Sequence, residues 1–231
     1  NAFFMVSPIV LDLDGNGIQT RSAADGVAFD LNATGQVGQY GWVGGNDGLL
    51  VMDRNNDGRI SDGTELFGAA TLDANGQRAG HGYAAMALED SNHDQVLDAS
   101  DANWNRLQVW VDADHDGVTD GGELNGLVEL GITSLDLHAQ RGSEVDQGNL
   151  LGLVSGYTTS DGKTHEMADV WFAKDAAGEP ATVSLGDVLS APGADLLPAT
   201  LAEAAHSAPV APTMVAGLRL EEEHRPLPPL I

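Results

Sequence analysis

The sequence predicts an α+β domain in which short antiparallel strands and short helices are organised around several EF-hand-like calcium loops. Two observations predict this class: brief apolar runs typical of short strands, and acidic windows in which Asp alternates with Asn and Gly. The windows recur four times before residue 124, and most follow an apolar run directly. We assign the domain to residues 7–175, after a lead-in of residues 1–6 and before an Ala- and Pro-rich tail or linker of residues 176–231.

The first half of the domain is expected to alternate strands with acidic windows. Apolar residues at 9–13 and 48–52 predict strands that lead into the first and second windows. Between them, residues 20–47 are rich in Gly, Asn and Asp, and their apolar residues are spaced as in short hairpin strands. Ala, Met and Leu at 83–89 predict a helix before the third window.

The second half is expected to contain one more strand and helix around the fourth window, followed by strands. Leu107, Val109 and Val111 alternate as in a strand before this window. Leu124, Leu127 and Val128 have helical spacing after it, with Gly131 suited to end the helix. The last expected elements are a strand at 132–137 and a hairpin of 150–158 with 164–172, joined by a turn at 161–162.

The net charge and the composition exclude several classes of function. Ten Lys and Arg stand against 35 Asp and Glu, a net charge of −25 that excludes a binder of nucleic-acid phosphates. No apolar stretch is long enough to span a membrane, and the absence of Cys excludes thiolate zinc sites and cysteine nucleophiles. The first Lys is Lys163, so few local cations neutralise the acidic windows. Crowded carboxylates resist joint ionisation unless a cation joins them, which predicts that the chain binds a metal ion. We expect the chain itself to be a monomer.

The fourth window matches the complete calcium loop. Such loops supply oxygens from positions 1, 3, 5, 7 (backbone carbonyl), 9 and 12, with Gly at position 6 for the sharp turn. Gly117 occupies position 6 here. The predicted ligands are Asp112, Asp114, Asp116, Val118, Asp120 and Glu123.

The second window has the same pattern with one residue inserted. Gly58 stands at position 6, but the closing Glu falls at position 13 instead of 12. A small expansion of the loop can still deliver its carboxylate, or Asp62 can serve through water. The predicted ligands are Asp53, Asn55, Asp57, Arg59 (carbonyl), Asp62 and Glu65.

The third window departs from the pattern at two places. Gln95 replaces Gly at position 6, and the closing acid is Asp, which is shorter than Glu. Both changes are expected to weaken the site without abolishing it. The predicted ligands are Asp90, Asn92, Asp94, Val96 (carbonyl), Asp98 and Asp101.

The first window lacks a closing acid of its own, because Ala23 stands at position 12. A distant oxygen must complete the site, and we expect it from Asp30. The predicted ligands are Asp12, Asp14, Asn16, Ile18 (carbonyl) and Asp30. Together the windows predict about three to four calcium ions, since loops of this kind suit Ca²⁺ better than the smaller Mg²⁺.

Six segments form a recognisable series: SPIVLDLDGNGI at 7–18, DGLLVMD at 47–53, GTELFG at 63–68, GYAA at 82–85, VWVD at 109–112 and LGITSLDL at 130–137. In order and at similar spacing, they resemble the self-processing module of RTX iron-regulated proteins of the Frp type. This resemblance implies a bacterial protein secreted by the type I route, whose module folds when it meets extracellular calcium.

The resemblance also implies self-cleavage at an Asp-Pro bond at the start of the module, where the Asp carboxylate attacks its own backbone carbonyl and forms a cyclic anhydride. This chain contains no Asp-Pro; Ser7 precedes Pro8 and has no carboxylate for that step. The sequence shows no activating base near the Ser7 hydroxyl, so no catalytic residue is assigned.

Three functions therefore remain open. The first is a calcium-dependent folding module of a secreted protein, the second is an autoproteolytic module that uses an unusual residue, and the third is a calcium-dependent adhesion or binding domain. For the third, Tyr40 and Trp42 are the expected contact residues for a protein or surface partner.

Overall fold

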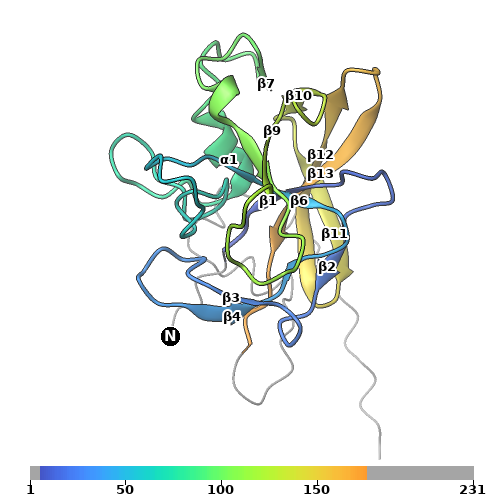
Figure 1. The fold of residues 1–231 in the computed structure, drawn as a ribbon. Coiled ribbons are helices and arrows are strands. Elements are labelled where there is room, and N and C mark those ends of the chain that lie inside the picture. The colour runs from blue at the N-terminus through green and yellow to red at the C-terminus, as the bar shows by residue number, and fades with distance from the viewer. Residues whose placement is uncertain (1–5, 176–231) are drawn as a thin grey trace, which may run out of the picture.

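The computed structural model describes residues 6–175 and shows a nearly all-β fold (Figure 1). A curled antiparallel sheet of nine strands forms its centre. The described residues contain one α-helix, α1 (Gly82–Ala87), and one 3₁₀ turn, η1 (Trp104–Arg106). The predicted α+β class is therefore wrong. Residues 1–5 of the expected lead-in and the tail at 176–231 lie outside the described residues.

The main sheet has the strand order β7-β10-β12-β13-β1-β6-β8-β9, and β11 pairs with β12 beside this path. Strands β2 with β5 and β3 with β4 form two small sheets. The strands are β1 (Ile9–Leu11), β2 (Thr20–Arg21), β3 (Val27–Phe29), β4 (Gly38–Tyr40), β5 (Trp42–Val43), β6 (Gly48–Val51), β7 (Val96–Asp98), β8 (Gln108–Trp110), β9 (Leu124–Gly126), β10 (Ile132–Asp136), β11 (Gln140–Asp146), β12 (Asn149–Thr159) and β13 (Thr164–Trp171).

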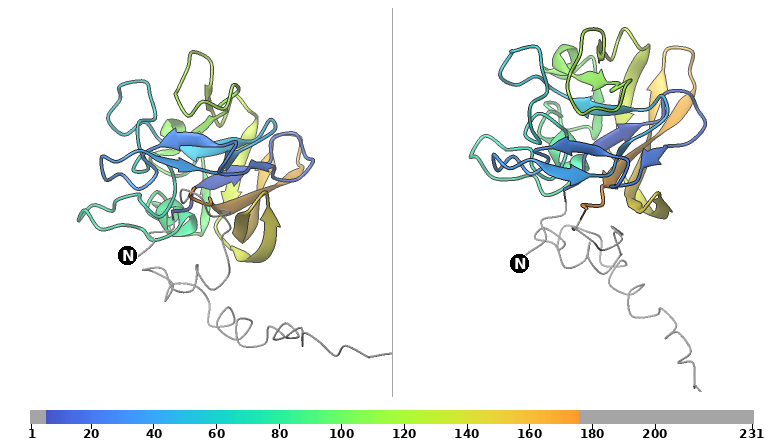
Figure 2. Two further views of the ribbon diagram at one scale, coloured as in Figure 1. Left: turned by 90° about the horizontal axis from the view of Figure 1, so that it is seen from below. Right: turned by 60° about the horizontal axis from the view of Figure 1, so that its bottom comes forward.

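The central strands β1 and β6 are buried on both faces, which explains why they are apolar without interruption. In β1, Ile9 and Leu11 belong to one core cluster together with Met86 of α1. Val10 belongs to a second cluster, which includes Trp42 from the small sheet β2–β5. The helix thus covers one face and the small sheets cover the other; Figure 2 shows the β3–β4 hairpin as a separate layer over the main sheet.

The expected helix after the fourth window is instead the edge strand β9, which pairs antiparallel with β8. The Val111 amide donates to the Glu123 carbonyl at 2.9 Å, so the acidic loop acts as the turn of a hairpin and returns the chain alongside β8. Pairing with β8 overrides the helical spacing of the side chains. Gly131, expected to end that helix, has the left-handed φ of 69° that suits such a position, but the segment it ends is a turn.

The expected helix before the third window is present but short. The His81 imidazole caps α1 by accepting a hydrogen bond from the Ala84 amide at 3.1 Å. Tyr83, Ala85 and Met86 bury one side of the helix. No helix in the described part of the chain is long and apolar enough to cross a bilayer. The predicted strands at β1, β6, β8 and β10 and the hairpin β12–β13 are confirmed.

Candidate metal centres

The first Asp of each acidic window holds its loop closed through two backbone amides. In the fourth window, Asp112 Oδ1 accepts from the Asp116 amide at 3.1 Å, and Oδ2 accepts from the Gly117 amide at 2.9 Å. The same two bonds, from the residues four and five positions later, recur in the other three windows. They are made by Asp12, Asp53 and Asp90.

Position 6 of every window has a left-handed backbone. Gly17, Gly58 and Gly117 have φ of 92°, 81° and 75°, values that Gly adopts without steric cost. In the third window Gln95 adopts φ of 67° at the same position. A side chain there is strained, so the third loop keeps the common shape at an energetic cost.

The closing acid of the fourth window is fixed by the loop itself. Glu123 accepts from the amides of Ala113 and Asp120, the second and ninth positions, at 2.9 and 3.0 Å. Burial alone would raise the pKa of Glu123, but these bonds and one from Trp110 outweigh it and lower that pKa. The carboxylate is therefore held ionised beside the loop.

The closing acids of the second and third windows occupy the equivalent place. Glu65 accepts from the amides of Arg54 and Ser61, at 3.2 and 2.9 Å, although one extra residue precedes it. Asp101 accepts from the amides of Ser91 and Asp98, at 2.8 and 3.0 Å. In each case the donors are the second and ninth residues of the window, as in the fourth.

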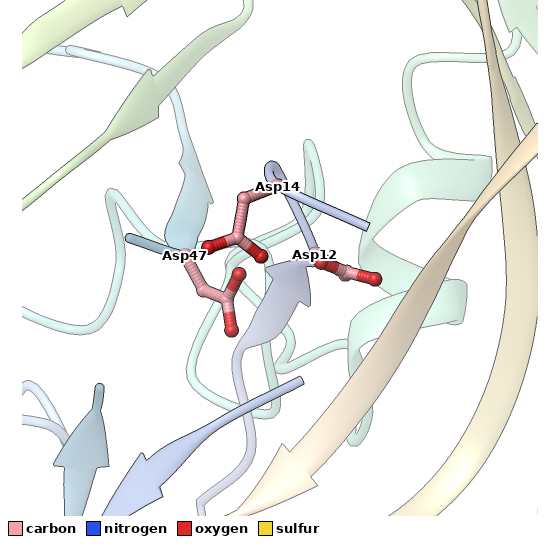
Figure 3. A group of neighbouring side chains, drawn as sticks. All are labelled: Asp12, Asp14 and Asp47. Atoms are coloured by element: carbon pink, nitrogen blue, oxygen red, sulfur yellow. The ribbon is translucent and has the colours of Figure 1, made fainter. Parts of the chain in front are cut away.

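The first window is closed by Asp47, which lies outside the spacing pattern of that window. Asp47 accepts from the amides of Leu13 and Gln19, at 3.2 and 2.8 Å, and Figure 3 shows its carboxylate facing that of Asp14. Burial, together with the charges of Asp12 and Asp14, raises the pKa of Asp47 to about 6. Its place at the end of a loop just before β6 is the signal that was available, because β6 pairs with β1, which carries the first window.

Asp30, the residue expected to complete the first window, begins a similar turn of its own. Its carboxylate accepts from the amides of Thr34 and Gly35, at 3.0 and 2.6 Å. The spacing Asp-x-Asn-x-Thr-Gly at 30–35 could have revealed this fifth turn. Thr at position 5 offers no carboxylate, so the turn is a poorer cation site than the other four.

Two windows bring three carboxylates together. Oxygens of Asp12, Asp14 and Asp47 lie within 4.8 Å of one another, and so do oxygens of the triad in the fourth window. Within residues 6–175 these are the groups of at least three Asp, Glu or His side chains close enough to hold one ion. The second triad is Asp112, Asp114 and Asp116.

Elsewhere the predicted ligands are engaged locally. Asp62 accepts from the amide and hydroxyl of Thr64, and Asp98 accepts from the amide and hydroxyl of Ser100. Asp120 is exposed at the ninth position of its loop. Position 9 of a calcium loop often contacts the ion through water, which suits the exposed Asp120 side chain.

Two tryptophans tie the fourth window to the core. Trp42 Nε1 donates to Asp112, and Trp110 Nε1 donates to Glu123. Trp42 is fully buried and Tyr40 is 3% exposed, because both pack in the core cluster under the small sheets. The expectation that these two residues form a surface for a partner is therefore wrong.

The comparison with protein families gives a direct match. The model of the SPM domain matches residues 9–173, which is most of the chain and nearly all of its described part. The chain belongs to the SPM-domain family. Both carboxylate triads of this SPM domain lie within the matched residues.

One curated relative supports the same assignment. The SPM chain is 44% identical over 176 residues to the iron-regulated protein FrpA of Neisseria meningitidis serogroup C. The alignment covers 75% of this chain but only 16% of FrpA, so the chain spans about a sixth of the length of that relative. The resemblance to the Frp-type module, predicted from the sequence segments, is confirmed.

Proposed function

We propose that this SPM domain is a calcium-dependent folding module of a bacterial RTX-type protein secreted by the type I route. The observation that supports the proposal best is the common geometry of the four windows. Each presents an Asp at position 1, a left-handed position 6 and an acid that is fixed by two loop amides. In the folded chain, loops of this shape suit a cation of the size of Ca²⁺ surrounded by oxygens.

The donor set fits calcium. Every predicted side-chain ligand offers an oxygen atom. Each of the two triads consists of three Asp carboxylates, with no Cys or His in either group. Carboxylates and backbone carbonyls favour hard cations, and loops of this length allow the six to eight ligands that Ca²⁺ takes. We infer about three to four ions, held by the predicted ligand sets with Asp47 in place of Asp30.

The repulsion within each triad explains how calcium can control folding. The carboxylates of Asp12, Asp14 and Asp47 lie close together, and Asp47 is buried, at 3% exposure. Without a cation this arrangement opposes the compact state, as the raised pKa of Asp47 indicates. With a cation the repulsion becomes attraction, so the same residues change from destabilising to stabilising.

The size of the effect is sufficient to control folding. Extracellular calcium modules have Kd values of about 10⁻⁴–10⁻³ M, and a ligand bound only by the folded state stabilises it by RT ln(1 + [L]/Kd). At about 1 mM calcium and a Kd near 10⁻⁴ M, each site contributes about 1.4 kcal/mol. Four sites then contribute about 6 kcal/mol, which approaches the whole stability of a typical domain. At cytosolic calcium levels this contribution disappears, and a loosely folded chain suits export through a channel.

The proposal is tested by titrating the chain with Ca²⁺ and, separately, with Mg²⁺ in a calorimeter while near-UV circular dichroism follows tertiary packing. We expect about three to four calcium equivalents to bind and the aromatic signal to develop with them. Mg²⁺ at the same concentration should produce a much smaller change. Binding of calcium to a chain whose aromatic signal is already complete would contradict the folding role.

A further inference from the structure

The peptide bond between Ser7 and Pro8 is clamped in the interior. Ser7 is fully buried, and its carbonyl oxygen accepts from the Ala69 amide at 2.9 Å. The Pro8 carbonyl accepts from the Val170 amide of β13, also at 2.9 Å. Gly68 lies so close that a Cβ there would clash with the Ser7 carbonyl oxygen. Backbone groups from two parts of the chain, at residues 68–69 and at Val170, therefore fix this bond.

A carboxyl group without a role in the metal loops faces Ser7. Asp169 lies opposite Ile9 in the β1–β13 ladder and is completely buried. Its Oδ2 accepts from the Gly82 amide at 2.8 Å, whereas Oδ1 has no hydrogen-bond partner in the described part of the chain. The Ser7 hydroxyl, also without a partner, is near enough to influence the acidity of Asp169.

The environment keeps Asp169 largely protonated below about pH 7. Burial raises its pKa to about 7, against the smaller effects of the Gly82 amide and the Ser7 hydroxyl. The other titratable side chain coupled to it is Tyr83, whose pKa is raised mainly by burial. A buried acid that holds its proton near neutrality can act as a proton donor.

We propose that Asp169 is the proton donor of a self-cleavage site at the bond between residues 7 and 8, and that this chain retains the donor and the clamped bond but lacks the nucleophile. Two adjacent buried carboxyl groups cannot both ionise, so a carboxylate at position 7 would share one proton with Asp169. One group is then ionised and able to attack, while the other is protonated and able to donate.

The chemistry balances with these two groups and water. The carboxylate introduced at position 7 attacks its own backbone carbonyl carbon and forms a C–O bond, which closes a five-membered anhydride. The C–N bond to Pro8 breaks, and the electron pair on the Pro8 nitrogen takes the proton of Asp169. Water opens the anhydride to two carboxyl groups, one of whose protons returns to Asp169. The Ser7 hydroxyl cannot replace the carboxylate, because attack on its own carbonyl would close a strained four-membered ring.

The test combines Ser7→Asp with Asp169→Asn in the full chain with millimolar calcium. Cleavage is followed by mass spectrometry, and folding is verified by near-UV circular dichroism. We expect Ser7→Asp to produce a new N-terminus at Pro8. The double variant should cleave at least about 100-fold more slowly, as for loss of a general acid. As a matched control, Asp161→Asn in the Ser7→Asp background should not change the rate, since Asp161 is an exposed turn residue paired with Lys163.

Two further results would overturn the proposal: a folded Ser7→Asp chain that stays intact, or single and double variants that cleave within a few-fold of each other. A catalytic role also predicts a cleavage rate that falls on both sides of a pH optimum with Asp169 present and that no longer declines at alkaline pH with Asn at this position.

If Ser7→Asp does not fold, the carboxyl ¹³C signal of Asp169 in the unmodified chain decides. A group already ionised at pH 5 is no donor; titration above pH 6 supports the role. Cleavage in EDTA by a folded chain would contradict the calcium proposal alone.

Discussion

Trp42 Nε1 donates a hydrogen bond of 2.7 Å to Asp112 Oδ2, which joins the aromatic core to the first residue of the fourth acidic window. Trp42 also packs edge-on against Trp110, with ring centroids 5.7 Å apart, and Trp110 donates to Glu123 at the end of the same loop. Both ends of the loop are therefore anchored to one pair of buried rings. Loop closure and core packing should then depend on each other.

Replacing Trp42 with Phe tests this coupling. The Trp42→Phe change removes the donor to Asp112 while keeping an aromatic ring, and hydrogen bonds to charged groups are worth about 1.5–3 kcal/mol. We expect calcium affinity to fall about tenfold in a calorimetric titration. Trp104→Phe is the matched control, because Trp104 is buried in the other core cluster. Equal losses of affinity in both variants would show that the bond to Asp112 does not matter.

The closing acids of the fourth and third windows should contribute unequally to calcium affinity and stability. Glu123 accepts from two loop amides and from Trp110 and is long enough for bidentate contact, whereas Asp101 is shorter and closes a loop with Gln at position 6. We expect Glu123→Gln to lower calcium affinity about tenfold or more and to reduce the melting temperature in calcium. Asp101→Asn should have a smaller effect on both. Equal small effects would count against this ranking of the sites.

Asp47 should have opposite effects with and without calcium. Its raised pKa means that the ionised form, present above about pH 6, opposes folding when no cation is bound. At pH 7.5, Asp47→Asn should therefore raise the melting temperature in EDTA and reduce the gain on adding calcium. Asp30→Asn, outside the triad, should leave the gain unchanged. A variant at position 47 with the full calcium gain would remove Asp47 from the first site.

The left-handed Gln95 predicts a stabilising substitution. Gln95→Gly relieves a φ of 67° and should raise stability by about 1 kcal/mol, seen as a melting temperature higher by a few degrees in calcium. Gln36→Gly serves as control, because Gln36 is exposed and does not have a positive φ. It should be neutral or slightly destabilising, since Gly adds freedom to the unfolded chain. A lower melting temperature for Gln95→Gly would contradict the strain assigned to this position.

Asp169 predicts a pH dependence with a definite sign. Its folded-state pKa of about 7 lies above the usual Asp value, so the folded state binds a proton that the unfolded state has lost. The stability it supports is complete at low pH and is lost as pH rises through about 7. In calcium buffer, Asp169→Asn should therefore gain several degrees of melting temperature over the unmodified chain as pH rises from 5 to 8. A difference that stays constant over this range would refute the assigned protonation.

Local patterns in the sequence predicted the loops and most central strands. The alternation of Asp with Asn and Gly specifies the turn directly, and the first residue of each window accepts from two loop amides within five residues. Likewise, the hairpin β12–β13 follows from two apolar runs around the turn at Asp161 and Gly162. Interactions between near neighbours leave a signature that a single sequence carries.

Long-range pairing explains what the sequence did not reveal. Leu124 has helical spacing, yet it joins β8 because the fourth loop reverses the chain. Asp47 and Asp169 reach Leu13 and Ser7 only because β1 lies between β6 and β13. No spacing rule connects residues so far apart, and their roles follow from the order of strands in the sheet. The same distance hid Trp42 as a buried partner of Asp112.

Thermal unfolding with and without a chelator measures whether calcium stabilises the fold. We expect a cooperative transition in 1 mM CaCl₂ (about the extracellular level) and a melting temperature lower by about 15 °C or more in EDTA, or no cooperative transition there, as expected for a loss of about 6 kcal/mol. The same melting temperature in both buffers would refute calcium-dependent folding, because the acidic loops would then fold without a cation.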